Sequence, residues 1–270
     1  MEENICNTMK SKYKFNDCVV EKRKDSTDGN VYMILYSNNK YIAKIYKKEE
    51  HAKSMINLHL FLIKNEFIVP NIVKNFKGDY YCNIDNNYIV VYTFIEGEQY
   101  GKMIENMNNI EYKNDTIKKI ATQLRKMHEI TQNNTFNLKE IKINDLKNEN
   151  KRKSVLHFDL TKNNIFICEN KIGFIDFDDA KYGDSLFDIA SAICLLFISK
   201  KRGVDENSID EFLNSYYNNE IELKKREISM IKIYAHEWIK EVLKNNNLEE
   251  SIRESFIFKD QIIKKIKIGE

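Results

Sequence analysis

The feature that most constrains this chain is a series of short apolar segments and polar loops between residues 155 and 188. The apolar segments are rich in β-branched and aromatic residues, a composition typical of strands. They occupy residues 155–156, 165–167 and 172–175. Four polar residues stand at the ends of these segments or in the loops between them: His157, Asp159, Asn164 and Asp176. Because loops at strand ends hold polar groups rigidly and leave them open to a ligand, the pattern predicts a functional site here.

The types and spacing of these residues favour phosphoryl transfer. That chemistry needs a carboxylate that orients the attacking hydroxyl and oxygen ligands for a metal ion beside the phosphates. Asp159 precedes Asn164 by five residues, and Asp176 follows twelve residues later. A hairpin of this length brings two loop residues and one post-strand residue into one cleft. Since Mg²⁺ prefers carboxylate and amide oxygens, Asn164 and Asp176 are candidate metal ligands.

Two segments resemble a known family. H-F-D-L-T-K-N-N, the catalytic loop of residues 157–164, resembles the H-x-D-x-x-x-x-N loop of the aminoglycoside phosphotransferase and choline kinase superfamily. I-D-F-D-D-A, residues 175–180, resembles that family's metal-binding segment, where protein kinases carry D-F-G. Phe158 and Thr161 occupy positions where many members carry Gly, Asn or His, which leaves the subfamily open.

The resemblance implies roles for particular residues. Asp159 would be the catalytic base and His157 a structural brace in the same loop, while Asn164 and Asp176 would bind Mg²⁺. Asp188, in L-F-D-I-A, would hydrogen-bond the catalytic loop. The alternative is a coincidental string, because Asp and Asn are ordinary turn residues and acidic turns are often merely solvated. The ordered combination of loop, hairpin and I-D-F favours the family interpretation.

The first part of the chain predicts an antiparallel sheet with one helix. The helix is expected over residues 49–66, where Met55, Leu58 and Leu62 have helical spacing. Strands are expected in the remaining apolar runs, residues 18–20, 31–36, 41–46, 71–76, 79–84 and 87–95.

The resemblance assigns nucleotide binding to this sheet. Lys44, inside the third strand, would contact the α- and β-phosphates. A turn containing Ser26, Thr27 and Gly29 would cover the phosphates, although it lacks a Walker A motif and an ordinary hairpin turn would look the same. Backbone groups of Tyr92, Thr93 and Phe94 would bind a purine edge, unless this is an ordinary sheet strand.

The acidic partner of Lys44 is not evident. The family usually supplies a Glu from the following helix, at a place that falls near Met55 or Asn57 here. Glu50 lies earlier than that place and is the nearest candidate. The partner therefore stays open.

The second part of the chain predicts helices. They are expected over residues 115–131, with His128 in a packing position near the end, and over 186–200, 205–219 and 222–247. In the family the C-terminal helices build the acceptor pocket. Glu237 would then meet a cationic substrate or, more simply, be solvated.

Composition excludes several classes of protein. The formal charge of +2 argues against nucleic-acid or membrane-surface binding through bulk charge. Five widely spaced cysteines without a C-x-x-C pair predict reduced thiols. No apolar run approaches the roughly 20 residues of a membrane span. A cytoplasmic monomer or homodimer is expected.

The combined prediction is an α+β, protein-kinase-like, two-lobed fold. Residues 1–95 would form an antiparallel β-rich nucleotide-binding lobe and residues 96–270 a mostly helical lobe. ATP, with GTP not excluded, would phosphorylate a hydroxyl of a small molecule such as an aminoglycoside-like antibiotic, choline or homoserine. A catalytically silent kinase-like scaffold of the spore-coat type is the alternative, favoured by the sparse glycine loop. A protein kinase is disfavoured because no A-P-E element follows Asp176.

Overall fold

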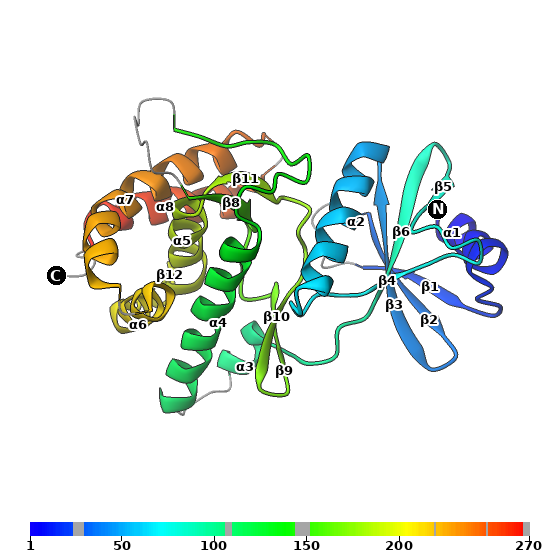
Figure 1. The fold of residues 1–270 in the computed structure, drawn as a ribbon, viewed down its shortest axis with the longest axis horizontal. Coiled ribbons are helices and arrows are strands. Elements are labelled where there is room, and N and C mark those ends of the chain that lie inside the picture. Colours follow the sequence, from blue (N-terminus) through cyan, green and yellow to red (C-terminus); the bar gives the residue numbers. More distant parts are fainter. Residues whose placement is uncertain (24–29, 106–109, 144–151, 219, 247, 267–270) are drawn as a thin grey trace. The chain divides into compact units, whose positions relative to one another are not determined.

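The computed structural model describes residues 1–23, 30–105, 110–143, 152–218, 220–246 and 248–266. The chain divides into two compact units, Met1–Glu96 and Gly97–Glu270 (Figure 1). Within the described residues, every helix is too short or too polar to cross a membrane.

The first unit is built on a six-stranded antiparallel sheet in the order β1-β2-β3-β6-β4, with β5 also paired to β6. Its strands are β1 (Val19–Lys22), β2 (Val31–Tyr36), β3 (Asn39–Tyr46), β4 (Ile72–Val73), β5 (Cys82–Ile84) and β6 (Asn87–Thr93). The β2–β3 connection is a two-residue turn in which Ser37 and Asn38 both have positive φ, 49° and 62°. Such turns match the twist of paired strands.

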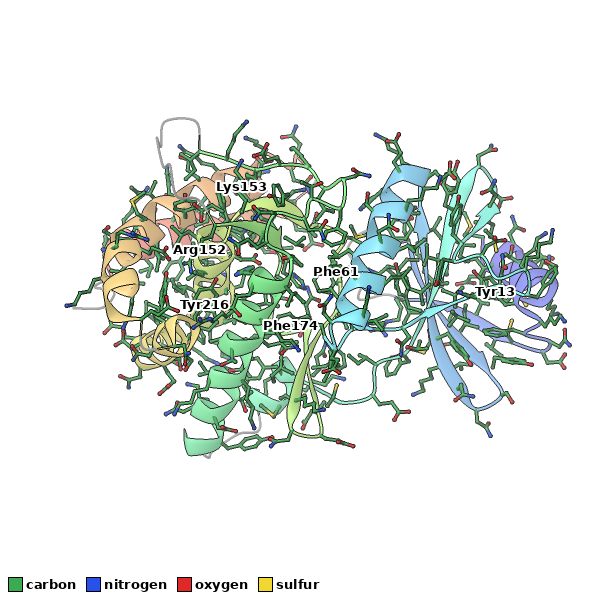
Figure 2. All side chains as sticks on the ribbon, in the orientation of Figure 1. Tyr13, Phe61, Arg152, Lys153, Phe174 and Tyr216 are labelled. Carbon is green, nitrogen blue, oxygen red and sulfur yellow. The ribbon has the colours of Figure 1, made fainter. Side chains whose placement is uncertain are left out.

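Helices cover both faces of this sheet. The predicted helix is α2 (Glu49–Lys64), which packs on β3, β4 and β6. On the other face lie α1 (Glu2–Thr8) and the π-helical η1 (Met9–Tyr13) (Figure 1). Ile5, Met9 and Tyr13 bury this helical face against alternate residues of the strands; Tyr13 is labelled in Figure 2. The sequence analysis missed this helix because it is short and only three apolar residues mark its buried face.

Two predicted strands are shorter than expected. Residues 71–76 and 79–84 contribute only β4 and β5. Asn75 interrupts the chain between them, because its side-chain oxygen accepts hydrogen bonds from the amides of Lys77 and Asp79, both at 2.9 Å. A side chain that closes a turn in this way ends a strand.

The second unit is mostly helical. Its helices are α3 (Tyr100–Glu105), α4 (Ile110–Ile130), α5 (Leu186–Ala192), the π-helical η2 (Ile193–Phe197), α6 (Glu206–Tyr217), α7 (Ile221–Leu243) and α8 (Glu250–Ile263). The main packed pairs are α4 with α6, α5 with α7, and α7 with α8. Buried aromatic and aliphatic side chains, Trp238 among them, fill this core.

Short strands position the loops of the second unit. They are β7 (Glu98–Gln99), β8 (Lys153–Leu156), β9 (Ile165–Cys168), β10 (Lys171–Phe174), β11 (Lys181–Asp184), β12 (Ile198–Ser199) and β13 (Gly203–Val204). β9 pairs with β7 and β10, and β8 pairs with β11, a strand that the sequence pattern did not predict. The helix predicted over 186–200 ends earlier, because Ile198 is extended and opens the β12–β13 hairpin. A β-rich first unit and a helical second unit confirm the predicted α+β class.

Candidate active site

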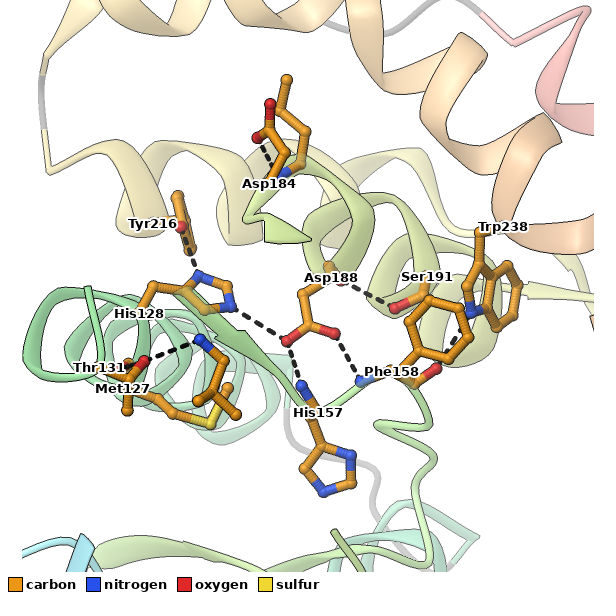
Figure 3. A network of polar contacts seen from close by, with 12 residues as sticks. Met127, His128, Thr131, His157, Phe158, Asp184, Asp188, Ser191, Tyr216 and Trp238 are labelled. Carbon is orange, nitrogen blue, oxygen red and sulfur yellow. Dashed lines mark hydrogen bonds and ion pairs between the residues drawn. The ribbon is translucent and has the colours of Figure 1, made fainter. Parts of the chain in front are cut away.

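Asp188, in the first turn of α5, holds the backbone that leads into the catalytic loop. Its carboxylate is completely buried. The two oxygens accept hydrogen bonds from the amides of His157, at 2.6 Å, and Phe158, at 2.7 Å (Figure 3). A carboxylate removed from water is stable only while such donors satisfy it. The backbone just before Asp159 is therefore fixed from α5, and the hydrogen bonds expected of Asp188 are present.

The same carboxylate is tied to two further helices. His128 of α4 donates from Nε2 to Asp188 at 3.0 Å, and its Nδ1 lies 2.7 Å from the hydroxyl of Tyr216 on α6. Figure 3 shows this chain of contacts running from Tyr216 through His128 to Asp188. All three side chains are buried. His128 therefore acts on the catalytic loop through Asp188.

His157 braces the loop against the segment that carries Asp176. Its ring is completely buried and packs on Phe174 and Phe177. Nε2 donates to the carbonyl of Ile175 at 2.9 Å. Burial lowers the pKa of the imidazole, although the negative charge of Asp188 opposes that shift. A neutral ring that anchors the residue before Asp176 has the geometry of a structural brace.

Asp159 and Asn164 form a pair within the catalytic loop. The amide nitrogen of Asn164 donates to the Asp159 carbonyl at 2.8 Å and to its carboxylate Oδ2 at 3.2 Å. The amide of Ile175 donates to the carbonyl of Asn164 at 3.0 Å, which places Asn164 beside the segment leading to Asp176. Asp159, Asn164 and the segment of Asp176 are thus linked by backbone and side-chain hydrogen bonds. The ring of His157 contacts the same segment through the carbonyl of Ile175.

The environment of Asp159 favours its protonated form. Burial is the main cause, followed by the negative charges of Asp179 and Asp176, and together they raise the pKa of Asp159 to about 7. The hydrogen bond from Asn164 and the positive charge of Lys259 act in the opposite direction. A raised carboxyl pKa is common in catalytic acids and bases.

The backbone on both sides of the site is strained. Phe158 and Asp176 have φ values of 68° and 66°, in the left-handed region that residues with a side chain rarely adopt. Phe158 is held there by Asp188 at its amide and by Trp238, whose Nε1 donates to the Phe158 carbonyl at 3.0 Å (Figure 3). A bulky residue such as Phe158 keeps this conformation only where the surroundings over-determine it.

The residues present fit an open Mg²⁺ site. Asn164 turns its amide nitrogen toward Asp159, so its carbonyl oxygen is the group left to bind a cation. Asp159, Asp176 and Asp179 concentrate negative charge nearby. Among the described residues, no three acidic, histidine or cysteine side chains gather closely enough to enclose a metal ion. Two protein ligands completed by water and phosphate oxygens are the usual arrangement for Mg²⁺.

The predicted nucleotide-binding residues lie in the first unit. Lys44 lies in β3 opposite Val90 of β6, on the face of the sheet that α2 covers. The amides of Thr93 and Phe94 donate to the carbonyls of Asn71, at 2.8 Å, and Lys40, at 3.2 Å. A purine edge at this segment would therefore need groups other than these two amides. Tyr92 is buried in β6, and Ser26, Thr27 and Gly29 lie outside the described residues.

The acidic residues of α2 lie at the start of the helix and not on its buried face. Its only acidic residues, Glu49 and Glu50, lie in the first turn. Glu49 pairs with Lys53 at 2.9 Å and accepts a hydrogen bond from the Tyr81 hydroxyl. Glu50 is exposed. The buried face of α2 instead carries mainly apolar residues and one histidine: Ala52, Ser54, Met55, Ile56, Leu58, His59 and Leu62.

Two lysines near the site were missed from the sequence. Lys162 belongs to the catalytic loop itself, and burial, with smaller effects from the charges of Arg202 and Lys113, lowers its pKa to about 8. Lys259 on α8 is only 8% exposed, and its Nζ lies 5.3 Å from the centre of the Phe256 ring. Lys162 was detectable as a cation inside the motif. Lys259 was not, because a lysine on an amphipathic helix normally faces water.

Comparison with known proteins finds a family model that matches the part of the chain that carries this site. Residues 138–218 match the model of the "Phosphotransferase enzyme family", a segment that contains the catalytic loop, Asp176 and Asp188. The predicted family resemblance is confirmed over this segment, which is less than a third of the chain. No curated protein matches the chain.

Solved structures confirm the protein-kinase-like fold. An amicoumacin kinase in complex with AMP-PNP, Ca²⁺ and Ami has a TM-score of 0.69 at 13% identity, covering 97% of this chain and 92% of that one. A microcompartment-associated aminopropanol kinase has a TM-score of 0.65 at 14% identity, with coverage of 97% and 94%. The GDP complex of aminoglycoside 2'-phosphotransferase-IIIa has a TM-score of 0.64 at 14% identity, with coverage of 97% and 98%. At such low identity the likeness concerns the fold and not the substrate.

Proposed function

We propose that this chain transfers the γ-phosphoryl group of ATP to a hydroxyl group of a small molecule. The observation that carries the proposal is the hydrogen-bonded pair of Asp159 and Asn164, tied through Ile175 to the segment of Asp176. Phosphoryl transfer needs a base and metal ligands held close together, and this pair supports assigning those roles to Asp159, Asn164 and Asp176. The family match over the same residues supports it.

The Asp159 carboxylate orients the acceptor hydroxyl and takes its proton as the new O–P bond forms. The bond between the γ-phosphorus and the bridging oxygen breaks, and ADP leaves with the electron pair. Asn164 and Asp176 would hold Mg²⁺, which supplies positive charge beside the phosphate oxygens when it is bound. His157 and Asp188 hold the loop backbone, so that Asp159 need not reorganise during the reaction.

The first unit supplies the nucleotide contacts in this proposal. Lys44 contacts the α- and β-phosphates, and the segment of Tyr92, Thr93 and Phe94 meets the purine. ATP and GTP are both to be tested as donors, because the phosphotransferase with the TM-score of 0.64 was solved with GDP.

A screen for ATP consumption tests the proposal. Wild type is incubated with Mg²⁺, ATP or GTP, and a panel of hydroxyl acceptors that includes aminoglycosides, choline, homoserine and sugars. The matched variants are Asp176→Ala, which removes a proposed metal ligand, and Asp210→Ala, at an exposed carboxylate on α6. We expect turnover with one class of acceptor, lost in the first variant and retained in the second. Turnover that Asp176→Ala does not impair would contradict the proposed metal site.

The alternative is a kinase-like scaffold that binds nucleotide without turnover. One observation favours it: the two acidic residues of α2 lie in its first turn, earlier than the place where the family usually carries its Glu. Calorimetric titration with Mg²⁺ and the non-hydrolysable analogue AMP-PNP separates the two. Binding without turnover of any acceptor supports the scaffold, and turnover excludes it.

A further inference from the structure

A cavity of about 540 Å³ lies within the second unit beside the catalytic loop. Helix α3, η2, the β12–β13 hairpin and the start of α6 supply its walls. Lys162 lines it from the catalytic loop, three residues after Asp159. The amide of Gly101 in α3 donates to the Lys162 carbonyl at 3.0 Å, so the wall of the cavity is joined directly to that loop.

The charged groups of the cavity do not balance. Lys113, Lys162 and Arg202 supply three positive charges, and Asp205 and Glu206 supply two negative ones. Asp205 is already engaged, because it pairs with Lys113 and accepts a hydrogen bond from the amide of Ser208 at 3.2 Å. Glu206 is exposed in the first turn of α6.

Two cations of the cavity therefore have no ion pair among the described residues, although the charge of Asp205 acts on Lys162 and Arg202 is exposed. In the part of the chain that the structure describes, no carboxylate pairs with Lys162 or Arg202. Lys162 is half-buried, and a partly desolvated ammonium group without a partner is costly. Arg202 lies in a turn of three consecutive cations, of which Lys200 is paired with Glu254 at 2.8 Å. The turn is closed by a hydrogen bond of 3.0 Å from the Arg202 amide to the Ser199 hydroxyl.

We infer that this cavity receives the acceptor substrate, and that the acceptor carries a carboxylate or phosphate group in addition to the hydroxyl that is phosphorylated. The inference rests on the proposed function and names its substrate class. Arg202 offers the forked donors that bind a carboxylate or phosphate with two hydrogen bonds, and Lys162 adds a point charge between that group and the catalytic loop. An acceptor with several amino groups would meet like charge in this cavity.

Binding is measured by calorimetry on the full chain carrying Asp159→Asn, which prevents turnover. The probes are glycerol 3-phosphate and malate, which separate phosphate from carboxylate recognition. Glycerol is the uncharged control and kanamycin the cationic one. We expect at least one anionic probe to bind at least tenfold more tightly than either control.

Matched variants locate the probe. Arg202→Gln and Lys162→Gln should each weaken binding at least tenfold, whereas Lys201→Gln, an exposed neighbour in the same turn, should not. Lys162→Arg should restore binding lost in Lys162→Gln, which a merely damaged loop would not allow. Saturating AMP-PNP should leave binding of the probe unchanged. Loss of probe binding in the presence of AMP-PNP, with Arg202→Gln without effect, would identify the proposed nucleotide phosphate site instead and overturn the inference.

Failure of this inference is distinguishable from failure of the proposed function. Turnover of a neutral or cationic acceptor that Arg202→Gln leaves intact would overturn the inference and preserve the phosphotransferase. Arg202-dependent anion binding without ATP turnover of any acceptor would preserve the cavity as an anion site and reject the proposed function. Absence of Arg202-dependent binding by both anionic probes overturns the inference outright.

Discussion

Two carboxylates of the second unit, Asp159 and Asp188, have opposite surroundings. Asp188 is completely buried and satisfied by two backbone amides and His128. Asp159 has one amide donor from Asn164 and two carboxylates as neighbours. Asp188 is thus suited to hold structure, and Asp159 to exchange a proton. Environment assigns different roles to the same side chain.

Asp188→Asn tests the first of these roles. In this variant an NH₂ group replaces one carboxylate oxygen. That group would point a hydrogen-bond donor at the backbone amide of His157 or Phe158, and this buried amide would lose its acceptor. We expect a loss of about 2–4 kcal/mol in the free energy of unfolding. Urea unfolding measures it, with the exposed Asp210→Asn as control, expected within about 0.5 kcal/mol of wild type. Equal stability of Asp188→Asn and wild type would contradict the described network.

Asp159→Asn tests the raised pKa through stability. The folded pKa of about 7 lies above the ordinary value of 3.8, so the folded state binds the proton more tightly. The contribution of this carboxyl to stability is therefore greatest in acid and is lost as the pH rises toward 7 and above. Wild type loses this contribution with rising pH and Asp159→Asn does not. The free energy of unfolding of Asp159→Asn, taken relative to wild type, should therefore increase by about 1–3 kcal/mol between pH 5 and pH 8. Urea unfolding at both pH values, without divalent cations, checks this, and a difference that does not change with pH would refute it.

Phe158 offers a test of backbone strain. Its φ of 68° is accessible to Gly but unfavourable for any residue with a Cβ. Phe158→Gly and Phe158→Ala both remove the ring and differ only in that preference. We expect the Gly variant to be more stable than the Ala variant by about 1 kcal/mol, the reverse of the usual order. Thermal unfolding compares the two, and the usual order would show that the backbone relaxes.

At the scale of elements, the first helix is the least expected feature of the fold. Ile5 and Met9 are completely buried against the sheet, although they lie in a short and polar segment. Alternation along β2 and β3 predicts two faces but does not say what covers the second one. The answer comes from tertiary packing, which local propensity does not encode.

Ile5→Ala tests whether this helix stabilises the first unit. Loss of a completely buried aliphatic side chain typically costs about 2–5 kcal/mol. The control is Asn7→Ala, exposed on the same helix. We expect a clear drop in the urea midpoint for the first variant alone. Equal midpoints for the two variants would mean that the helix does not contribute to the core.

At the scale of the whole molecule, the part of the site that follows one continuous motif was predictable. Asp159, Asn164, Asp176 and Asp188 lie within 30 residues, and the family match covers all four. The cavity proposed for the acceptor was not predictable, because its lining comes from elements far apart in the chain: α3, α4, the catalytic loop, η2, the β12–β13 hairpin and α6. Lys162 and Arg202 line the same cavity only after the chain has folded. Their separation in the sequence does not predict that they lie there together.

The most direct test of the central claim is phosphoryl transfer itself. Wild type and Asp159→Asn are incubated with ATP, Mg²⁺ and the acceptor found by screening, and ³¹P NMR follows the product. We predict a phosphate monoester from wild type and a rate lower by about 10²–10⁴-fold in the variant, since loss of a general base has that effect. Equal rates in the two proteins, or no phosphorylated acceptor from wild type, would contradict the account.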